Sequence, residues 1–235
     1  MLELKNICYS VSDDNGDAAI LKDVSLTIED RKFIVITGPN GGGKTTLAKA
    51  IMGIVPLTGG QVLLDGQDIT GLSVTERARL GISYGFQQPP RFKGMKVRDL
   101  LAVAAGRDLS HDEACAYLTR VGLCARDYLG RDVDTSLSGG EVKRIEIATV
   151  LARQAKLMIF DEPEAGIDLW SFARLTETFG EIRAREECTM VIISHQERII
   201  SLADEILVVD RGAVDEIYPK IMSQTSVGCN LLEVD

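Results

Sequence analysis

Residues 38–46 combine a glycine-rich run with a lysine and two hydroxyl side chains. Their order matches GxxxxGK(S/T), a pattern whose glycines let backbone amides turn inward around a phosphate group. An apolar run precedes the segment and a stretch of helical spacing follows, so a helix N-terminus would add its dipole there. This context favours a phosphate site over a simple glycine-rich turn. Nine residues are expected to bind phosphate: Gly38, Pro39, Asn40, Gly41, Gly42, Gly43, Lys44, Thr45 and Thr46.

Within this segment, Lys44 and Thr45 carry the chemistry that backbone amides cannot supply. The Lys44 ammonium would reach the β- and γ-phosphates of a nucleotide, and the Thr45 hydroxyl would coordinate Mg²⁺. The sequence therefore predicts a nucleoside triphosphate and Mg²⁺ as ligands.

A second pattern is an apolar run, residues 157–160, that ends in two adjacent carboxylates, Asp161 and Glu162. In open α/β sheets, ligands bind at the carboxyl ends of the strands. There Asp161 would hold Mg²⁺ through water, and Glu162 would polarise the water that attacks the phosphate. Such a pair alone is usually a solvated turn, but a preceding phosphate motif favours the catalytic interpretation.

A third pattern is Ser138, Gly139 and Gly140, which open a helix directly. Small residues with exposed amides at a helix start form a second nest for an anion. Ser138 and Glu141 also match a capping box, in which each residue satisfies a backbone amide of the other. A plain helix start is thus an alternative, and both interpretations are compatible.

Taken together, Leu137-Ser138-Gly139-Gly140-Glu141 and the two earlier motifs resemble the motifs of ATP-binding-cassette (ABC) ATPases. The resemblance covers residues 2–215 and implies four further roles. Tyr9 would stack on adenine, and Gln87 would sense Mg²⁺ and the γ-phosphate, giving Thr45, Gln87 and Asp161 as metal residues. Asp168 would communicate across a dimer, and His195 would contact the γ-phosphate beside the catalytic residues Glu162 and Lys44.

The resemblance also implies a mechanism and a self-association. Each ATP would lie between the phosphate loop of one copy and the signature helix of another, so two copies close head to tail around two ATP molecules. Lys44, Mg²⁺ and the signature amides would stabilise the charge of the transition state. Loss of the γ-phosphate would let the dimer open.

Two segments, residues 138–147 and 161–168, depart from the pattern of transporter subunits. Residues 87–90 and 194–200 also look like the SufC-like ATPase of the Suf iron–sulfur assembly machinery. That resemblance implies soluble scaffold partners of the SufB/SufD type. The alternatives are the ATP-binding subunit of a membrane transporter, with permease subunits as partners, and a switch protein in which slow hydrolysis only resets a clamp.

The elements that must position these motifs are visible in the apolar pattern. Short apolar runs at 33–36, 157–160, 190–193 and 206–209 suit strands buried on both faces, as in a parallel sheet. Between them, helical spacing is seen over 44–52, 141–153, 169–184 and 196–202. Residues 1–30 and 59–70 read as strands of an antiparallel flap.

These elements predict an α/β fold of the P-loop NTPase class: a mainly parallel sheet with helices on both faces. Residues 89–137 are expected to be mainly helical, with apolar spacing over 97–105 and 114–123. We expect one domain over 1–235, divided into a nucleotide-binding core (1–88 and 147–220), a helical signature subdomain (89–146) and a tail (221–235).

Composition limits the partners and the compartment. The chain has 26 basic and 35 acidic residues and a net charge of −9, which argues against a broad nucleic-acid surface. No apolar stretch approaches the roughly 18–20 residues that span a bilayer, so no membrane insertion is expected. Cysteines at 8, 115, 124, 188 and 229 form no CxxC pair. The sequence therefore predicts a cytoplasmic protein in a reducing compartment.

Overall fold

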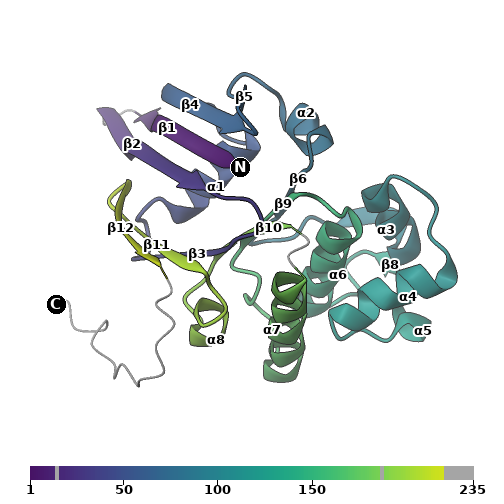
Figure 1. Ribbon diagram of the computed structural model, residues 1–235. Coiled ribbons are helices and arrows are strands. Elements are labelled where there is room, and N and C mark those ends of the chain that lie inside the picture. Colours follow the sequence, from purple (N-terminus) through teal and green to yellow (C-terminus); the bar gives the residue numbers. More distant parts are fainter. Residues whose placement is uncertain (14–15, 186–187, 220–235) are drawn as a thin grey trace, which may run out of the picture.

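A six-stranded sheet with the order β12-β11-β3-β10-β9-β6 forms the centre of the protein (Figure 1). In this computed structural model, which describes residues 1–13, 16–185 and 188–219, five of the strands run parallel and β12 pairs antiparallel with β11. The expected tail and Cys229 lie outside the described residues. The strands are β3 (Phe33–Thr37), β6 (Ile82–Gly85), β9 (Leu157–Asp161), β10 (Thr189–Ile193), β11 (Glu205–Asp210) and β12 (Ala213–Pro219).

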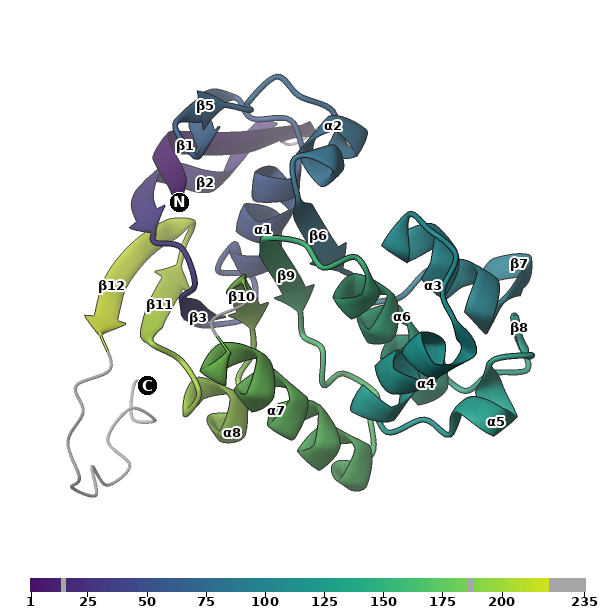
Figure 2. The ribbon, with the colours of Figure 1, turned by 45° about the vertical axis from the view of Figure 1, so that its right-hand side comes forward.

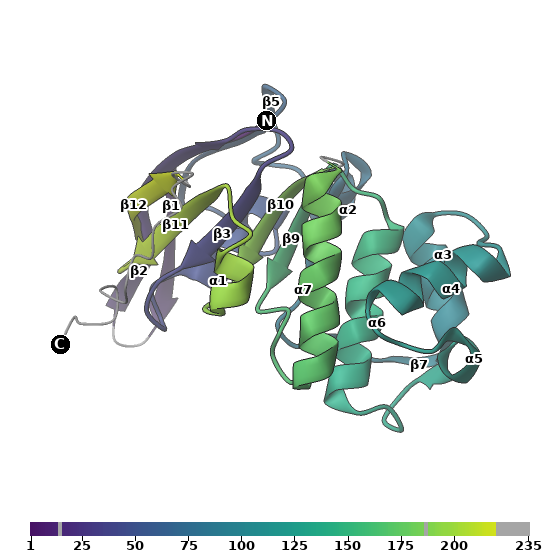
Figure 3. The same cartoon turned by 60° about the horizontal axis from the view of Figure 1, so that its bottom comes forward.

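A second, antiparallel sheet with the order β2-β1-β4-β5 forms the expected flap. It comprises β1 (Leu2–Asp13), β2 (Gly16–Ile28), β4 (Gly59–Leu64) and β5 (Gln67–Asp68). Figure 3 shows this sheet on one side of the parallel strands and the helices α3 to α5 on the other. The α/β fold with an antiparallel flap is thereby confirmed.

The helices largely follow the sequence expectations, with three differences. The segment 196–202 was expected to be helical throughout, but only α8 (Glu197–Ile200) is. The helix expected over 114–123 begins three residues earlier, as α4 (His111–Arg120). The segment 89–137 also contains a short hairpin, β7 (Phe92–Lys96) with β8 (Asp132–Val133). The other helices are α1 (Lys44–Met52), α2 (Val74–Arg79), α3 (Val97–Ala105), α5 (Ala125–Tyr128), α6 (Gly139–Ala152) and α7 (Leu169–Ala184).

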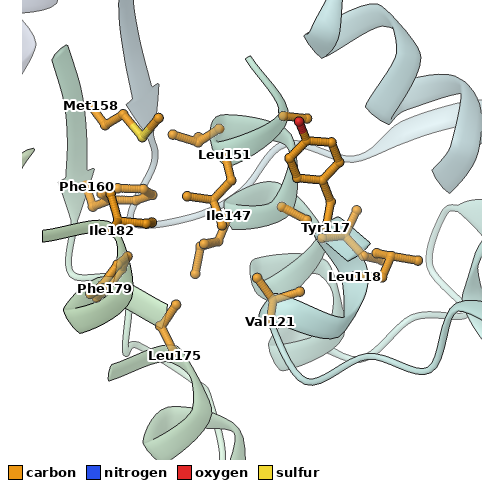
Figure 4. Close-up of a cluster of buried hydrophobic side chains, with 14 of the residues drawn as sticks. Tyr117, Leu118, Val121, Ile147, Leu151, Met158, Phe160, Leu175, Phe179 and Ile182 are labelled. Atoms are coloured by element: carbon orange, nitrogen blue, oxygen red, sulfur yellow. The ribbon is translucent and has the colours of Figure 1, made fainter. Parts of the chain in front are cut away.

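Alternate residues of the parallel strands point into two separate cores, because side chains alternate between the faces of a sheet. Ile34 and Ile159 pack on one face, with α1 and the antiparallel sheet. Phe33 and Phe160 pack on the other, with α6 and α7. Figure 4 shows this second core, where α4 joins it through α6; its labelled residues are Tyr117, Leu118, Val121, Ile147, Leu151, Met158, Phe160, Leu175, Phe179 and Ile182.

Arg77 on α2 holds the C-terminal end of α1 in place. It is only 2% exposed, and its Nη1 donates to the backbone oxygens of Ala50 and Ile51, both at 2.8 Å. Its Nη2 donates to Thr70 O at 2.7 Å, and its Nε donates to Leu72 O at 3.2 Å. The guanidinium thus gives Ile51 O a donor, adds a second donor to Ala50 O, which also accepts from Gly53 N, and complements the negative end of the helix dipole.

We predict that Arg77→Ala lowers the free energy of unfolding by about 2–4 kcal/mol, because several buried carbonyls lose their donor. Urea unfolding followed by circular dichroism measures the change. The matched control is Arg79→Ala in the same helix turn, where the side chain is exposed and the effect should stay within about 0.5 kcal/mol. If both variants unfold at the same urea concentration, Arg77 does not stabilise the end of α1 as assigned.

Candidate active site

The phosphate loop between β3 and α1 is pressed against the end of β11. Gly38 has φ +128°, and a Cβ placed on it would lie 2.2 Å from Val209 O; one on Gly42 would lie 2.6 Å from the same oxygen. No side chain fits there, so glycine is required at both positions. Pro39, Asn40 and Gly41 are exposed. The loop therefore presents its outer backbone to a ligand while its inner side is fixed by the sheet.

Lys44, the first residue of α1, folds back into this loop. It is 6% exposed, and its Nζ donates to Gly38 O at 2.6 Å and Pro39 O at 2.8 Å. Burial lowers its pKa, and the nearby carboxylates of Glu162 and Asp161 oppose that shift. The ammonium is thus poised at the loop, where phosphate oxygens would be stronger acceptors than the two carbonyls that it now uses.

Asp161, the last residue of β9, links α1, the helix after the phosphate loop, to the edge strand β6. Its Oδ1 accepts a hydrogen bond from Thr45 Oγ1 at 2.9 Å, and its Oδ2 accepts one from Tyr84 OH at 3.1 Å. Asp161 is 1% exposed, and burial raises its pKa. Burial and the Asp161 charge also raise the pKa of Tyr84, which therefore stays a donor. Tyr84 was missed by sequence reasoning, because nothing in the local pattern of β6 marks it.

These groups fit a divalent cation that shares its ligands with phosphate. A buried carboxylate beside a hydroxyl offers the oxygen ligands that Mg²⁺ prefers. Within residues 1–13, 16–185 and 188–219, no group of three or more His, Cys, Asp or Glu side chains could hold a metal. A cation at Thr45 and Asp161 would thus need a nucleotide to complete its coordination. The Thr45 hydroxyl and the Asp161 carboxylate would hold it.

Glu162 lies directly after Asp161 in a backbone conformation that non-glycine residues rarely adopt. Its φ is +44°, in the left-handed region, and its N–H donates to Ile193 O of the neighbouring strand at 3.0 Å. Such strain persists at functional sites when the surroundings enforce it. The Glu162 Oε2 accepts a hydrogen bond from Gln87 Nε2 at 2.8 Å. The structure therefore pairs Gln87 with the catalytic candidate Glu162.

His195 follows the end of β10 on the same edge of the sheet. Its Nδ1 lies 3.5 Å from Thr37 Oγ1, at the end of β3, and the side chain is exposed. Next to it, Ser194 Oγ donates to Glu164 Oε1 at 2.5 Å. Burial raises the pKa of Glu164, whose Oε2 has no hydrogen-bond partner within the described ranges. Glu164 is a second residue that sequence reasoning did not identify as part of this region.

Ser138, Gly139 and Gly140 lie at the start of α6. The capping box is present, since Ser138 N donates to Glu141 Oε2 at 2.6 Å and Glu141 N donates to Ser138 Oγ at 3.3 Å. A Cβ on Gly140 would lie 2.7 Å from Gly166 O, so the signature turn rests on the loop before α7. The hydrogen bond from Tyr128 OH, then those from Ser138, hold the pKa of Glu141 at about 2.

Asp168 and Tyr9 occupy the two outer ends of the candidate site. Asp168 caps α7, and its Oδ1 accepts a hydrogen bond from Ser171 N at 3.0 Å. Tyr9 of β1 is half-buried and pairs with Leu21 of β2, whose side chain reaches 3.3 Å from the Cβ position of Gly43. The candidate adenine residue thus lies one strand away from the phosphate loop.

One chain therefore brings together some of the expected site residues and holds others elsewhere. The phosphate loop, Asp161, Glu162, Gln87 and His195 meet at the carboxyl ends of β3, β9 and β10. Figures 1 and 2 place α1 beside the antiparallel sheet and α6 beside α3 and α4. The signature residues accordingly contact the Gly166 turn in the chain itself.

Comparison with known proteins decides the family. The family model described as "ABC transporter" matches residues 21–165, more than half of the chain. The chain belongs to the ABC ATPase family. An uncharacterised ABC transporter ATP-binding protein of Methanocaldococcus jannaschii is 39% identical over 207 residues, 85% of this chain and 82% of that protein. The sulfate/thiosulfate import ATP-binding protein CysA of Synechocystis is 31% identical over 90% of this chain but only 59% of its own length.

The solved structures agree on the fold. The dimeric post-hydrolysis state of an ATP-binding cassette bound to ADP and phosphate has a TM-score of 0.84 and 23% identity, covering 93% of this chain and 98% of that one. As a member of the ABC ATPase family, the chain binds and hydrolyses ATP, with Mg²⁺ as the cofactor. The closer resemblance to the Suf ATPase is not confirmed, because the relatives named above are transporter ATP-binding proteins.

We predict that Lys44→Ala weakens ATP binding by about 100-fold, because a charge-assisted contact to phosphate is lost. Isothermal titration calorimetry with ATP and Mg²⁺ measures the dissociation constant. Lys49→Ala, near the other end of α1, is the matched control and should bind as the native chain does. Normal nucleotide affinity in Lys44→Ala would remove this lysine from the phosphate site.

Proposed function

We propose that this ABC ATPase is a motor subunit that closes head to tail with a second copy around two ATP molecules and thereby drives a partner protein. One observation carries the proposal: the start of the signature helix α6 lies open at the surface. Ser138 and Gly139 are exposed, and a Cβ on Gly139 would meet nothing within 4 Å. A phosphate held by another copy fits this surface.

The hydrolysis chemistry follows from the groups at the sheet edge. Glu162 accepts a hydrogen bond from Gln87 and is close enough to Lys44 to affect its pKa, so its carboxylate would face the γ-phosphate and orient a water for in-line attack. Lys44 would stabilise the charge on the phosphate oxygens, and His195 would contact the γ-phosphate from the end of β10. Thr45 and Asp161 would hold the Mg²⁺ ion, which would neutralise part of the same charge.

We propose a membrane permease made of separate chains as the partner, with the ATPase on the cytoplasmic side. The relatives support this, since their names describe transport, including sulfate/thiosulfate import for one. Within the described residues, no helix has the length and apolar character to span a bilayer. We propose the helical signature subdomain, residues 89–146, as the region on which the permease docks.

Iron–sulfur assembly on soluble SufB/SufD-type scaffolds is the second candidate. It is favoured by the departures from the transporter pattern at residues 141–147 and 161–168. In this case the same ATP-driven closure would rearrange a scaffold on which a cluster is built. Both candidates share the ATPase cycle and differ in the partner.

We predict that Glu162→Gln retains ATP binding but loses at least about 100-fold in turnover, because the amide cannot act as the carboxylate does on water. With ATP and Mg²⁺ the variant should accumulate as a dimer, measured by size-exclusion chromatography with light scattering. Glu177→Gln, at an exposed position of α7, is the control and should hydrolyse normally and stay monomeric after turnover. A Glu162→Gln chain that stays monomeric with ATP contradicts the dimer cycle.

The partner is tested by affinity purification of the tagged chain from cytosol and, separately, from detergent-solubilised membranes. We expect a polytopic membrane protein to co-purify from the membrane fraction. Recovery of a soluble scaffold, with iron–sulfur absorbance in the eluate, would instead support the second candidate and rule out the permease.

A further inference from the structure

Lys143 and Glu146, one turn apart on α6, are charged side chains in the interior of the protein. They are 1% and 8% exposed, and Lys143 Nζ lies 3.5 Å from Glu146 Oε2. Both residues lie in the segment that departs from the pattern of transporter subunits. Replacing a buried ion pair by apolar residues is often neutral or stabilising, so stability alone does not explain the pair.

The two charges hold one peptide segment from both sides. Glu146 Oε1 accepts a hydrogen bond from Phe86 N at 2.7 Å, and Lys143 Nζ donates to Phe86 O. Lys143 Nζ also lies 3.4 Å from Gln87 O. Phe86 and Gln87 leave the sheet after β6, with exposed side chains. The ion pair therefore fixes the backbone from which the Gln87 side chain projects.

The same ammonium reaches the other half of the catalytic centre. Lys143 Nζ lies 3.4 Å from Asp161 O, the carbonyl of the peptide that joins Asp161 to Glu162. Lys143 thus contacts the backbone next to both Gln87 and Glu162, whose side chains are joined at 2.8 Å. Burial lowers the pKa of Lys143 below its usual value, and the nearby carboxylates of Glu146, Asp161 and Glu164 oppose part of that shift.

We propose that the Lys143–Glu146 pair is a positioning device that sets the distance between Gln87 and Glu162 and couples the signature helix to the water-activating centre. Both residues lie on the helix that begins with Ser138, Gly139 and Gly140. A displacement of α6 therefore moves the peptide groups that carry Gln87 and Glu162. The inference rests on ATP hydrolysis at this site and adds two residues that do not touch ATP.

The test separates turnover from binding and from stability. In Lys143→Met, the nucleotide affinity should stay within about twofold of the native value, because the phosphate loop is untouched. The kcat should fall by about tenfold or more, because Gln87 and Glu162 lose their common anchor. Calorimetry, steady-state ATPase kinetics and thermal unfolding are measured on the same full-length preparations.

The double variant Lys143→Met/Glu146→Leu removes both charges of the pair, so that neither is left in the interior without its partner. We expect it to be more stable to heat than Lys143→Met, in which Glu146 is unpaired, but not to recover the native kcat. Recovery of kcat together with stability would overturn the proposal, as would a fall in nucleotide affinity parallel to kcat in Lys143→Met. The exposed pair of the same spacing on α7, in Arg174→Gln/Glu177→Gln, is the control and should leave kcat unchanged.

Failure of the proposed function would look different in the same assays. A native chain that hydrolyses ATP but does not dimerise would contradict the head-to-tail cycle and leave the positioning role intact. If Lys143→Met hydrolyses ATP with the kcat of the native chain, the positioning role is contradicted and the head-to-tail cycle is not affected.

Discussion

The buried carboxylate of Asp161 is the point at which the parts of this ABC ATPase are tied together. Its two oxygens accept hydrogen bonds from Thr45 at the start of α1 and from Tyr84 on the edge strand β6, and its backbone oxygen lies next to Lys143 of α6. A charge this deeply buried is stable only when such donors surround it. Because α1 and β6 supply these donors and α6 reaches the backbone oxygen of the same residue, the phosphate loop, the sheet edge and the signature helix cannot move independently of Asp161.

The parallel sheet and the local motifs follow from the sequence, whereas the contacts between them do not. Glycines that face Val209 O and a helix beginning at Lys44 are consequences of short-range geometry, and the pattern 38–46 predicts them. The strand β6 was not predicted, because Ser and Gly interrupt its short apolar run. The helix expected over 196–202 forms only over the four residues of α8, because the segment has too few apolar residues for a longer buried face. Tyr84 and Glu164 acquire meaning only from partners far away in the sequence.

The signature segment illustrates how one local structure serves two purposes. The capping box consumes the Ser138 side chain and the Glu141 carboxylate, and the low pKa of Glu141 keeps that cap charged at neutral pH. The cap stabilises the start of α6. It leaves the start of α6 open at the surface, where Ser138 and Gly139 are exposed. The proposed closure with a second copy would therefore require no refolding of α6.

The position of the departures from the transporter pattern bears on the choice of partner. Lys143 and Glu146 are buried, so they cannot touch a permease or a scaffold and act on the catalytic centre instead. In the proposed docking region, exposed side chains such as Phe92 and Val103, which are 38% and 68% exposed, would contact the partner instead. Lys143 and Glu146, which belong to the segment that favours iron–sulfur assembly, therefore bear on how ATP is hydrolysed and not on which partner the hydrolysis drives. For this reason a direct capture of the partner, and not a finer motif comparison, distinguishes transport from assembly.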